Sequence, residues 1–476
     1  MHTNRSAFVT LISVFFFWGF VAASNDILIP VFKEKLHLEQ WQSQLISVAF
    51  YVAYTVGSII YILLSKIYGG DILNKLGYKN GIALGLCISA MGTLLFYPAA
   101  QLVSFNLMIT GLFIVALGFS LQQTAANPLA IVMGNPKQAS QRLSLAGGIN
   151  NVGTTIGPLV VSYAIFGSVG TSLKLDSIES VKIPYLCLGA AFLIVAVIFK
   201  FSSLPNQIFN EEDGAKSDRG ESRSGSLKYP QLVLGMIAIF VYVGVEVSTA
   251  SNLPEYMRQY INIETGQAAP YISLFWASLM IGRWTSSAGA FETSSGLKKA
   301  LRFIMPYLAF SVFLLVNALA KSDLKVFYPY SFVILLLIVA DVLSKGNPAR
   351  QLLLFSFCGI AALITGMMTS GLVSVYAFIS VGLFCSTLWP CIFTLAITGL
   401  GKFTNQGSSY LIMMIMGGGL ISWLQGWLAG PEMIGIKASY TVGVFCFAYL
   451  AFYGWRTSKI LRSQGIELDE KVSSSH

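Results

Sequence analysis

Residues 15–30, FFFWGFVAASNDILIP, belong to the first long apolar run of the chain and contain a single charged residue, Asp26. A carboxylate in the middle of a membrane-spanning helix costs roughly 2.5–3.5 kcal/mol on insertion scales, so it normally faces a partner or a water-filled cavity. The residues at helical spacing before Asp26 are Gly19, Ala22 and Ala23, all of them small. This face predicts a pathway for a solute or a proton, and a solvated Asp at the membrane interface is the alternative.

The composition of the whole chain agrees with a first helix that crosses a membrane. Hydrophobic residues make up 55% of the 476 residues, charged residues only 11%, and the mean hydropathy is +0.69. Because soluble proteins carry about 25% charged residues, this composition predicts an all-α polytopic membrane protein. The net charge of +9 comes from basic residues scattered through short loops, which indicates membrane topology and not nucleic-acid binding. The six cysteines lie inside apolar runs without metal-ligand spacing, so we expect no metal site.

Windows of about twenty apolar residues predict about fourteen membrane spans. They lie near 6–31, 43–67, 80–99, 103–133, 142–168, 182–203, 229–257, 268–291, 299–320, 327–345, 351–369, 371–399, 407–430 and 435–456.

The only long polar stretch, residues 204–228, divides these spans into two groups. It predicts a cytoplasmic linker between an N-terminal six-helix bundle over residues 1–203 and a C-terminal bundle over residues 229–456. Residues 457–476 are expected to form a cytoplasmic tail. Lys and Arg concentrate in the loops on the side of the N-terminus, so the positive-inside rule predicts that both termini are cytoplasmic.

An internal repeat accounts for the unequal numbers of spans in the two halves. The pairs Asn127-Pro128 and Trp389-Pro390 occupy equivalent places, each followed by a glycine-containing loop and a glycine-rich span. Fewer spans precede the first pair than separate the linker from the second pair. We therefore expect a pair of inserted helices at about 299–345, packed outside the two bundles, apolar around most of their circumference and without a mid-helix acid or amide. The alternative is that one or both of them only dip into the membrane interface.

Amide side chains in the first half form two polar stripes. Ser120, Gln123 and Asn127 follow the spacing i, i+3, i+7 in the fourth span, and the fifth span carries Arg142 and Asn150 on one face. Amides offer both donors and acceptors, which suits a polyhydroxylated ligand. The alternative is that these side chains hold helices together, and the glycines of the fifth span are expected to serve packing.

In the second half, Tyr242, Glu246 and Thr249 share one face of the seventh span. A buried Glu246 needs a partner or a proton. Arg283 is the basic residue expected within a span, so structural pairing of Glu246 with Arg283 is the favoured interpretation.

Aromatic rings that stack on sugars are also expected near the cavity, although most aromatic residues of such a chain serve packing or the interfacial belt. The candidates are Trp18, Tyr51, Tyr97, Trp276 and Trp389. The sequence has no phosphate-binding glycine loop, metal spacing or catalytic triad, so an ATP-driven pump or an enzyme is disfavoured.

Several motifs resemble those of the fucose–galactose–glucose:proton symporter branch of the major facilitator superfamily. They are Asn25-Asp26-Ile-Leu, Ser47-Val-Ala-Phe-Tyr51, Tyr97-Pro-Ala-Ala100, Thr124-Ala-Ala-Asn-Pro128, Arg142-Leu-Ser-Leu-Ala146, Tyr242-Val-Gly-Val-Glu246, Met280-Ile-Gly-Arg283 and residues 399–409, GLGKFTNQGSS. The resemblance covers both halves except the linker and roughly 292–345. It implies a major facilitator fold of two six-helix bundles, a central sugar site and alternating access. It also implies that Asp26 matches the proton-coupling aspartate of the family and Asn150 a sugar-contacting asparagine.

The chain departs from this family pattern at three positions. Gln123 stands where the family has a glutamate, Ala23 where it has an asparagine, and Cys385 where an asparagine is expected. The second site carboxylate is therefore absent, and the identity of the sugar stays open.

The predicted function is a secondary active transporter that imports a monosaccharide, a hexose such as glucose, galactose or fucose or a relative, by proton symport. Asp26 is expected to carry the proton, and the predicted substrate-binding residues are Asn25, Tyr51, Gln123, Asn127, Asn150, Glu246 and Trp389. An uncoupled sugar facilitator is the alternative, and a non-transporting sugar sensor is less favoured. We expect a monomer in the bacterial inner membrane, with a sugar and a proton as substrates and no cofactor or nucleic acid.

Overall fold

The computed structural model describes residues 5–35, 40–166, 182–202, 204–206, 225–263, 265–288, 290, 294–319, 323–430 and 432–466. Within these ranges all regular structure is helical, so the predicted all-α class is confirmed. Eleven of the helices in this part of the chain are long and apolar enough to cross a membrane, and Ser6–Val21 forms a shorter apolar helix. Most of the predicted linker and residues 467–476 of the predicted tail lie outside the described residues.

The helices of the first half form one group. They are α1 (Arg5–Lys35), α2 (Gln40–Ile67), α3 (Ile72–Leu76), α4 (Tyr78–Leu94), α5 (Phe96–Gln101), α6 (Phe105–Val132), the short 3₁₀ helix η1 (Pro136–Gln138), α7 (Ala139–Phe166) and α8 (Lys182–Phe201). Within this N-terminal group, α1 packs on α7, and α4 packs on α6 and α8.

The helices of the second half form the C-terminal group. They are η3 (Ser226–Lys228), α10 (Pro230–Ile261), α11 (Thr265–Ser287), α12 (Ser295–Leu319), η4 (Lys325–Phe327), α13 (Tyr330–Ser344), α14 (Pro348–Met368), α15 (Gly371–Cys385), α16 (Leu388–Ile397), η5 (Gly401–Phe403), α17 (Thr404–Met413), η6 (Met414–Met416), α18 (Gly417–Leu428), α19 (Gly435–Ser439) and α20 (Thr441–Ser463). In this group α10 packs on α18, α20 and α16, and α14 packs on α15 and α20.

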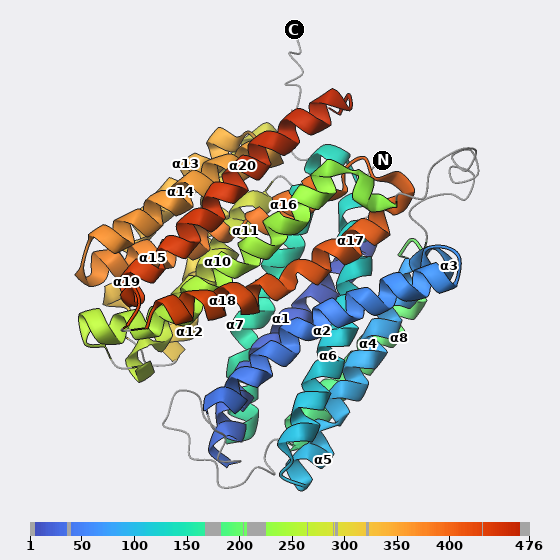
Figure 1. Ribbon diagram of the computed structural model, residues 1–476, viewed down its shortest axis with the longest axis horizontal. Helices are drawn as coiled ribbons and strands as arrows, with labels where there is room; N and C mark the ends of the chain where they lie inside the picture. The colour runs from blue at the N-terminus through green and yellow to red at the C-terminus, as the bar shows by residue number, and fades with distance from the viewer. Residues whose placement is uncertain are drawn as a thin grey trace.

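The two groups lie close together at one end of the molecule and diverge toward the other (Figure 1). We call the end of the molecule at which α1 and α10 begin and α20 ends the terminal end, and α3 and α17 lie near it. The opposite end, which holds α5 and α19, is the distal end. Contacts between the groups join α7 to α11 and α16, and α2 and α6 to α17. Each of these contacts involves α7, which follows Asn127-Pro128, or α17, which follows Trp389-Pro390.

Glycines let helices of one group approach closely. A side chain added at Gly153 of α7 would place its Cβ 2.7 Å from the Phe20 amide nitrogen of α1, and one at Gly92 of α4 would lie 2.6 Å from the Gly111 carbonyl oxygen of α6. Real Cβ atoms essentially never come so close, so these positions require glycine. The packing interpretation of the glycine-rich fifth span agrees with this geometry.

The two proline pairs affect their helices differently. α6 continues through Pro128 to Val132, whereas the polypeptide leaves the helix after Cys385 and resumes at Leu388, just before Trp389-Pro390. The helix that leads to Trp389-Pro390 is therefore interrupted at Ser386 and Thr387, the latter three residues before the proline. Pro390 has no amide hydrogen, so the Ser386 carbonyl lacks the donor that a regular helix supplies four residues later.

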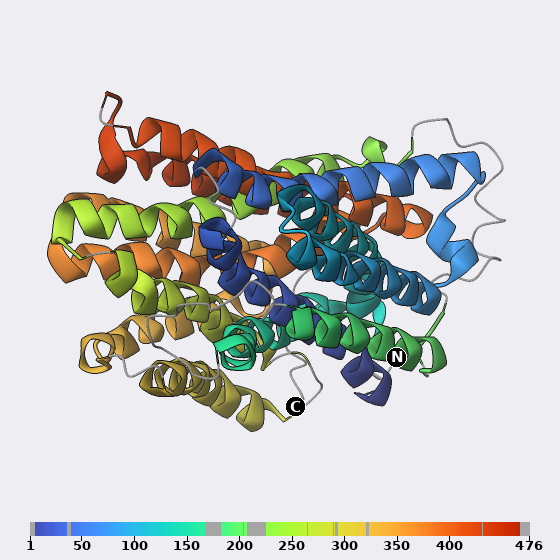
Figure 2. The same ribbon diagram turned by 90° about the horizontal axis from the view of Figure 1, so that it is seen from below.

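The helices α12 and α13 form a hairpin at the periphery of the C-terminal group (Figure 2). α12 packs against α11, and α13 packs against α14 and α11. Their outer faces expose large apolar side chains, among them Phe303, Leu315, Phe332 and Leu336. This position agrees with the expected peripheral packing.

The hairpin carries one amide and one acid in the last turns of its helices. Asn317 of α12 is buried and donates through Nδ2 to Ser273 Oγ of α11 at 3.4 Å. Asp341 of α13 is also buried, and its Oδ2 lies 3.3 Å from Arg302 Nε of α12. These polar groups point away from lipid because each has a partner inside the protein.

Candidate functional site

The predicted polar stripe on α6 faces α2 over most of its length. Ser120 Oγ donates to the Tyr54 carbonyl at 3.2 Å, and Gln123 Nε2 donates to the Tyr54 hydroxyl at 3.1 Å. Asn127, one turn further, is 2% exposed, and its Nδ2 atom has no hydrogen-bond partner among the described residues. Helix-to-helix bonding therefore explains Ser120, whereas Asn127 retains a free donor for a ligand.

Asn150 of α7 joins the first and fifth predicted spans. Its Nδ2 donates to the Phe15 carbonyl of α1 at 2.8 Å. Asn25 and Asp26 lie on α1, but their side chains fall outside the described residues. The structure thus fixes the position of Asn150 relative to the start of the FFFWGF stretch.

Arg142, at the beginning of the same stripe on α7, serves the end of α6. Its guanidinium donates to the carbonyls of Ala130 at 3.2 Å and Asn135 at 2.8 Å, and also to that of Ile131. The last carbonyls of a helix have no intrahelical donors, so a basic side chain stabilises them. Arg142 is fully buried by this arrangement, and its role is structural.

Three predicted residues of the C-terminal group lie near one another. The rings of Tyr242 on α10 and Trp389 on α16 have their centres 6.1 Å apart, and Glu246 follows Tyr242 by one turn. The Tyr242 hydroxyl and Glu246 Oε2 are both buried, and the two side chains interact with each other across one turn of α10. Like Asn127, they are polar atoms that a ligand could satisfy.

Arg283 connects the two groups. Its Nε donates at 3.0 Å to the Ser386 carbonyl, the one that Pro390 leaves without a helical donor. Its Nη1 donates across the boundary to Asn151 Oδ1 at 2.8 Å and to the Gly147 carbonyl at 3.4 Å. Arg283 makes no direct salt bridge to Glu246 in the described part of the chain, because its guanidinium is engaged by α7 and by the broken helix, but the two side chains lie close enough to interact electrostatically.

Further contacts between the groups cluster at the terminal end. Trp284 Nε1 donates to the Gly148 carbonyl at 3.2 Å, and the Tyr78 hydroxyl donates to Asn405 Oδ1. These residues were not predicted as functional. The signal available in the sequence was the place of Trp284 directly after Arg283, next to the loop at the end of its span.

The aromatic candidates divide between the site and the scaffold. Tyr51 of α2 lies against Gly418 of α18, so it sits at the boundary between the groups. Trp18 is buried and donates to Gln122 Oε1 at 2.5 Å within the N-terminal group. Tyr97 lies at the distal end, beneath the ammonium of Lys182, and Trp276 is exposed on α11. The expectation that Trp18 and Tyr97 lie at the sugar site is therefore not supported by their contacts.

Comparisons with known proteins agree with the helical arrangement. A family model described as Major Facilitator Superfamily matches residues 7–340. The glucose/galactose transporter of Brucella abortus biovar 1 (strain 9-941) is 33% identical over 468 residues, which cover 96% of this chain and 97% of that protein. The L-fucose-proton symporter of Escherichia coli (strain K12) is 26% identical over 463 residues, covering 94% of this chain and 92% of that protein.

A crystal structure of a Major Facilitator Superfamily transporter, FucP, in the outward conformation is similar over 95% of this chain and 98% of that chain. The TM-score is 0.71, and the sequences are 25% identical. The resemblance seen in the sequence motifs is confirmed by these matches. The chain belongs to the Major Facilitator Superfamily.

Proposed function

We propose that this protein is a secondary active transporter that imports a monosaccharide, a hexose such as glucose, galactose or fucose or a relative, by proton symport. The observation that carries the proposal is the similarity, over nearly the whole chain, to proteins named as a glucose/galactose transporter and an L-fucose-proton symporter. The unpaired polar atoms on both sides of the boundary between the groups are consistent with a sugar, whose hydroxyls both donate and accept.

The sugar site in this proposal is assembled from both groups. The Asn127 Nδ2 atom on α6 is buried without a partner among the described residues, and the Tyr242 hydroxyl on α10 is buried beside Glu246, so sugar hydroxyls that bond to them reduce a cost of burial. Trp389 offers a half-buried ring beside Tyr242 for stacking. The remaining proposed contacts are Asn25, Tyr51, Gln123, Asn150 and Glu246.

The transport cycle is alternating access of this site to the two sides of the membrane. Basic residues concentrate on the terminal side, which supports an orientation with both termini in the cytoplasm of a bacterium. In that orientation the contacts of Arg283, Trp284 and Asn405 close the cytoplasmic side. The present conformation then faces outward, as does the similar FucP structure.

Proton coupling is assigned to Asp26. Gln123, in place of the glutamate of the family pattern, cannot titrate, and it bonds to the Tyr54 hydroxyl. A proton that crosses 100 mV releases about 2.3 kcal/mol. At 1.4 kcal/mol per tenfold, one proton per sugar supports about fifty-fold accumulation.

Uptake of a radiolabelled sugar panel by cells that express the protein, with and without a protonophore, tests the proposal. We expect uptake of at least one hexose, sugar-evoked alkalinisation of the medium, and loss of accumulation with the protonophore. Asp26→Asn should abolish accumulation but preserve counterflow, and Gln123→Glu should change the pH profile of uptake. Uptake that is insensitive to the protonophore and lacks alkalinisation identifies the alternative, an uncoupled facilitator, whereas no uptake of any sugar refutes the assignment.

The proposal includes the organisation of the chain in the membrane. The protein acts as a monomer in the inner membrane, with the linker at 204–228 between two six-helix bundles and the α12–α13 hairpin as an addition to the second, giving about fourteen spans. Apolar outer faces on both hairpin helices support their contact with lipid.

A further inference from the structure

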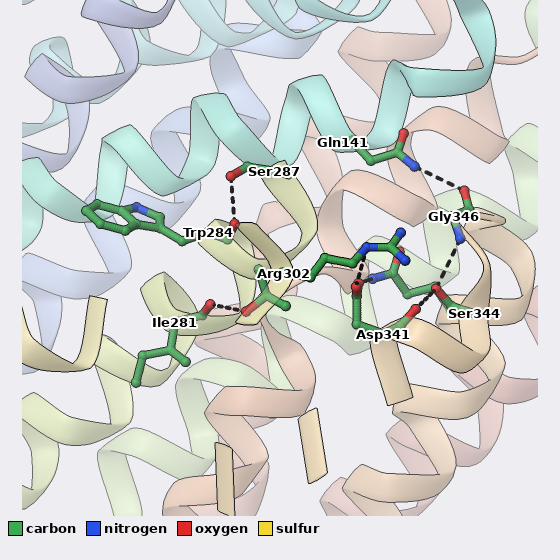
Figure 3. Close-up of polar contacts among 10 residues, drawn as sticks. Gln141, Ile281, Trp284, Ser287, Arg302, Asp341, Ser344 and Gly346 are labelled. Atoms are coloured by element: carbon green, nitrogen blue, oxygen red, sulfur yellow. Dashed lines mark hydrogen bonds and ion pairs between the residues drawn. The ribbon is translucent and has the colours of Figure 1, made fainter. Parts of the chain in front are cut away.

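The α12–α13 hairpin contacts the N-terminal group as well as its own. Gln141 lies near the start of α7, and its Nε2 donates to the Gly346 carbonyl, directly after α13, at 3.2 Å. Gln141 is 4% exposed. This bond crosses the boundary between the groups (Figure 3). Arg283 and Trp284 also bond to α7 at the terminal end.

A turn at the end of α13 presents the Gly346 carbonyl to Gln141. Lys345 and Gly346 both have positive φ, 52° and 73°, so the chain leaves the helix in the left-handed region. Ser344 Oγ donates to the Asp341 carbonyl at 2.6 Å and accepts from the Gly346 amide at 3.4 Å. Ser344 therefore ties the turn to the last turn of the helix.

A buried polar network holds the end of α13 in place. Asp341 faces Arg302 of α12 at 3.3 Å and accepts from Gln351 Nε2 of α14 at 3.1 Å. Gln351 Oε1 in turn faces Cys391 Sγ of α16 at 3.5 Å. Because a buried charge is costly without its partner, this network fixes the relative positions of α12, α13 and α14. Figure 3 shows Arg302 and Asp341 pointing toward each other beside Ser344.

The hairpin is also attached to the helix that carries the other boundary contacts. The Tyr330 hydroxyl of α13 lies 2.9 Å from Ser278 Oγ of α11, and Asn317 of α12 bonds to Ser273 of α11. Arg283 and Trp284 lie further along α11. The hairpin thus touches both sides of the boundary, through α11 on one side and Gln141 on the other.

We propose that the α12–α13 hairpin is a clamp that stabilises the closed terminal end. When the groups separate at that end, the Gln141–Gly346 bond has to break, whereas the buried network and the contacts with α11 stay within the C-terminal group. The hairpin therefore favours the present conformation over the one open at the terminal end. This inference rests on the alternating access of the proposed function.

The test measures the separation of the groups at the terminal end in the full-length protein in lipid nanodiscs. Spin labels are introduced through a non-canonical amino acid at Lys66 of α2 and Lys459 of α20, both exposed, so that the native cysteines are retained. Gln141→Leu removes the donor, and Gln141→Asn keeps an amide that is too short to reach Gly346. Each should raise the ratio of separated to closed molecules roughly two- to tenfold, the effect of one hydrogen bond.

Two reference variants make the result decisive. Trp284→Phe, which removes the indole donor to Gly148, measures the shift caused by the loss of an established boundary contact. Gln101→Leu makes the same kind of substitution at an exposed position at the distal end and should leave the distances unchanged. The clamp is refuted if Trp284→Phe shifts the distances while both Gln141 variants match the wild type, or if Gln101→Leu shifts them equally.

The outcome is separable from that of the proposed function. The distances are measured without any sugar, so a wild-type protein that transports none of the tested hexoses still reports on the clamp. Conversely, sugar uptake by the wild type with unchanged distances in the Gln141 variants supports the transporter and overturns the clamp.

Discussion

Substitution of Gly148 by alanine should open the terminal end of the transporter. A Cβ atom at this position of α7 would lie 2.7 Å from Trp284 Cδ1 and 3.1 Å from Trp284 Nε1, across the boundary between the two groups. Ordinary van der Waals contact begins at 3.4 Å, so the indole has to move by about 0.7 Å. The ring also donates to the Gly148 carbonyl, and this bond limits its freedom to turn aside.

The size of the effect follows from where the strain acts. Overpacking by one methyl group typically costs about 1–3 kcal/mol. The strain exists only while the groups are in contact, so it should change the ratio of separated to closed molecules by about five- to 150-fold. The gain in helix propensity from glycine to alanine, up to about 1 kcal/mol, acts in both conformations and does not alter this ratio.

The neighbouring glycine provides the matched control. A Cβ atom at Gly147 would lie 3.2 Å from Arg283 Cδ, in the flexible part of a long side chain that can yield by a few tenths of an ångström. The distance between labels at Lys66 and Lys459 should therefore shift strongly toward separation in Gly148→Ala and little in Gly147→Ala. A wild-type distance distribution in Gly148→Ala would show that Trp284 does not hold the groups together.

Three further predictions concern other contacts and are tested by thermal unfolding of the purified protein. Asn150→Ala removes the side-chain donor to the Phe15 carbonyl and should cost about 0.5–1.5 kcal/mol, and sugar affinity measured on the folded fraction separates this loss from a role in binding. Arg302→Gln should lower the free energy of unfolding by about 3–5 kcal/mol because Asp341 stays buried without its cation. Adding Asp341→Asn should restore most of this stability, and a double variant that is as unstable as Arg302→Gln contradicts the prediction. Burial raises the pKa of Asp71, which caps α3, above its ordinary value of 3.8. The contribution of Asp71 to stability should therefore fall as pH rises from about 3.8 toward the folded-state pKa. Asp71→Asn should remove this part of the pH dependence, and an unchanged stability profile in the variant counts against the prediction.

Local sequence was sufficient to predict the class of the protein and the identity of its membrane helices. Apolar runs of the required length can be stable in lipid only as helices, because every backbone group has to be bonded within its own segment. Proline removes one of those bonds, but α6 continues through Pro128 whereas the helix before Pro390 breaks, so this local signal did not decide which helix is interrupted. The motifs also identified the superfamily, as the comparisons confirm.

The partners of the polar side chains could not be predicted from the sequence. Arg283 was expected to pair with Glu246, but it bonds to Asn151 of the other group and to the carbonyl exposed by Pro390. Likewise, no spacing in the sequence indicates that Asp341 of α13 is buried against Arg302 of α12.

The sequence by itself therefore determined that the chain forms membrane helices and where they lie, because both depend on residues within a few positions of one another. Only the tertiary structure decided which charge meets which acceptor. Residues 103 positions apart, Arg283 and Ser386, become neighbours through the crossing of α11 with α15. Such a crossing depends on the packing of whole helix faces, and no local spacing encodes it.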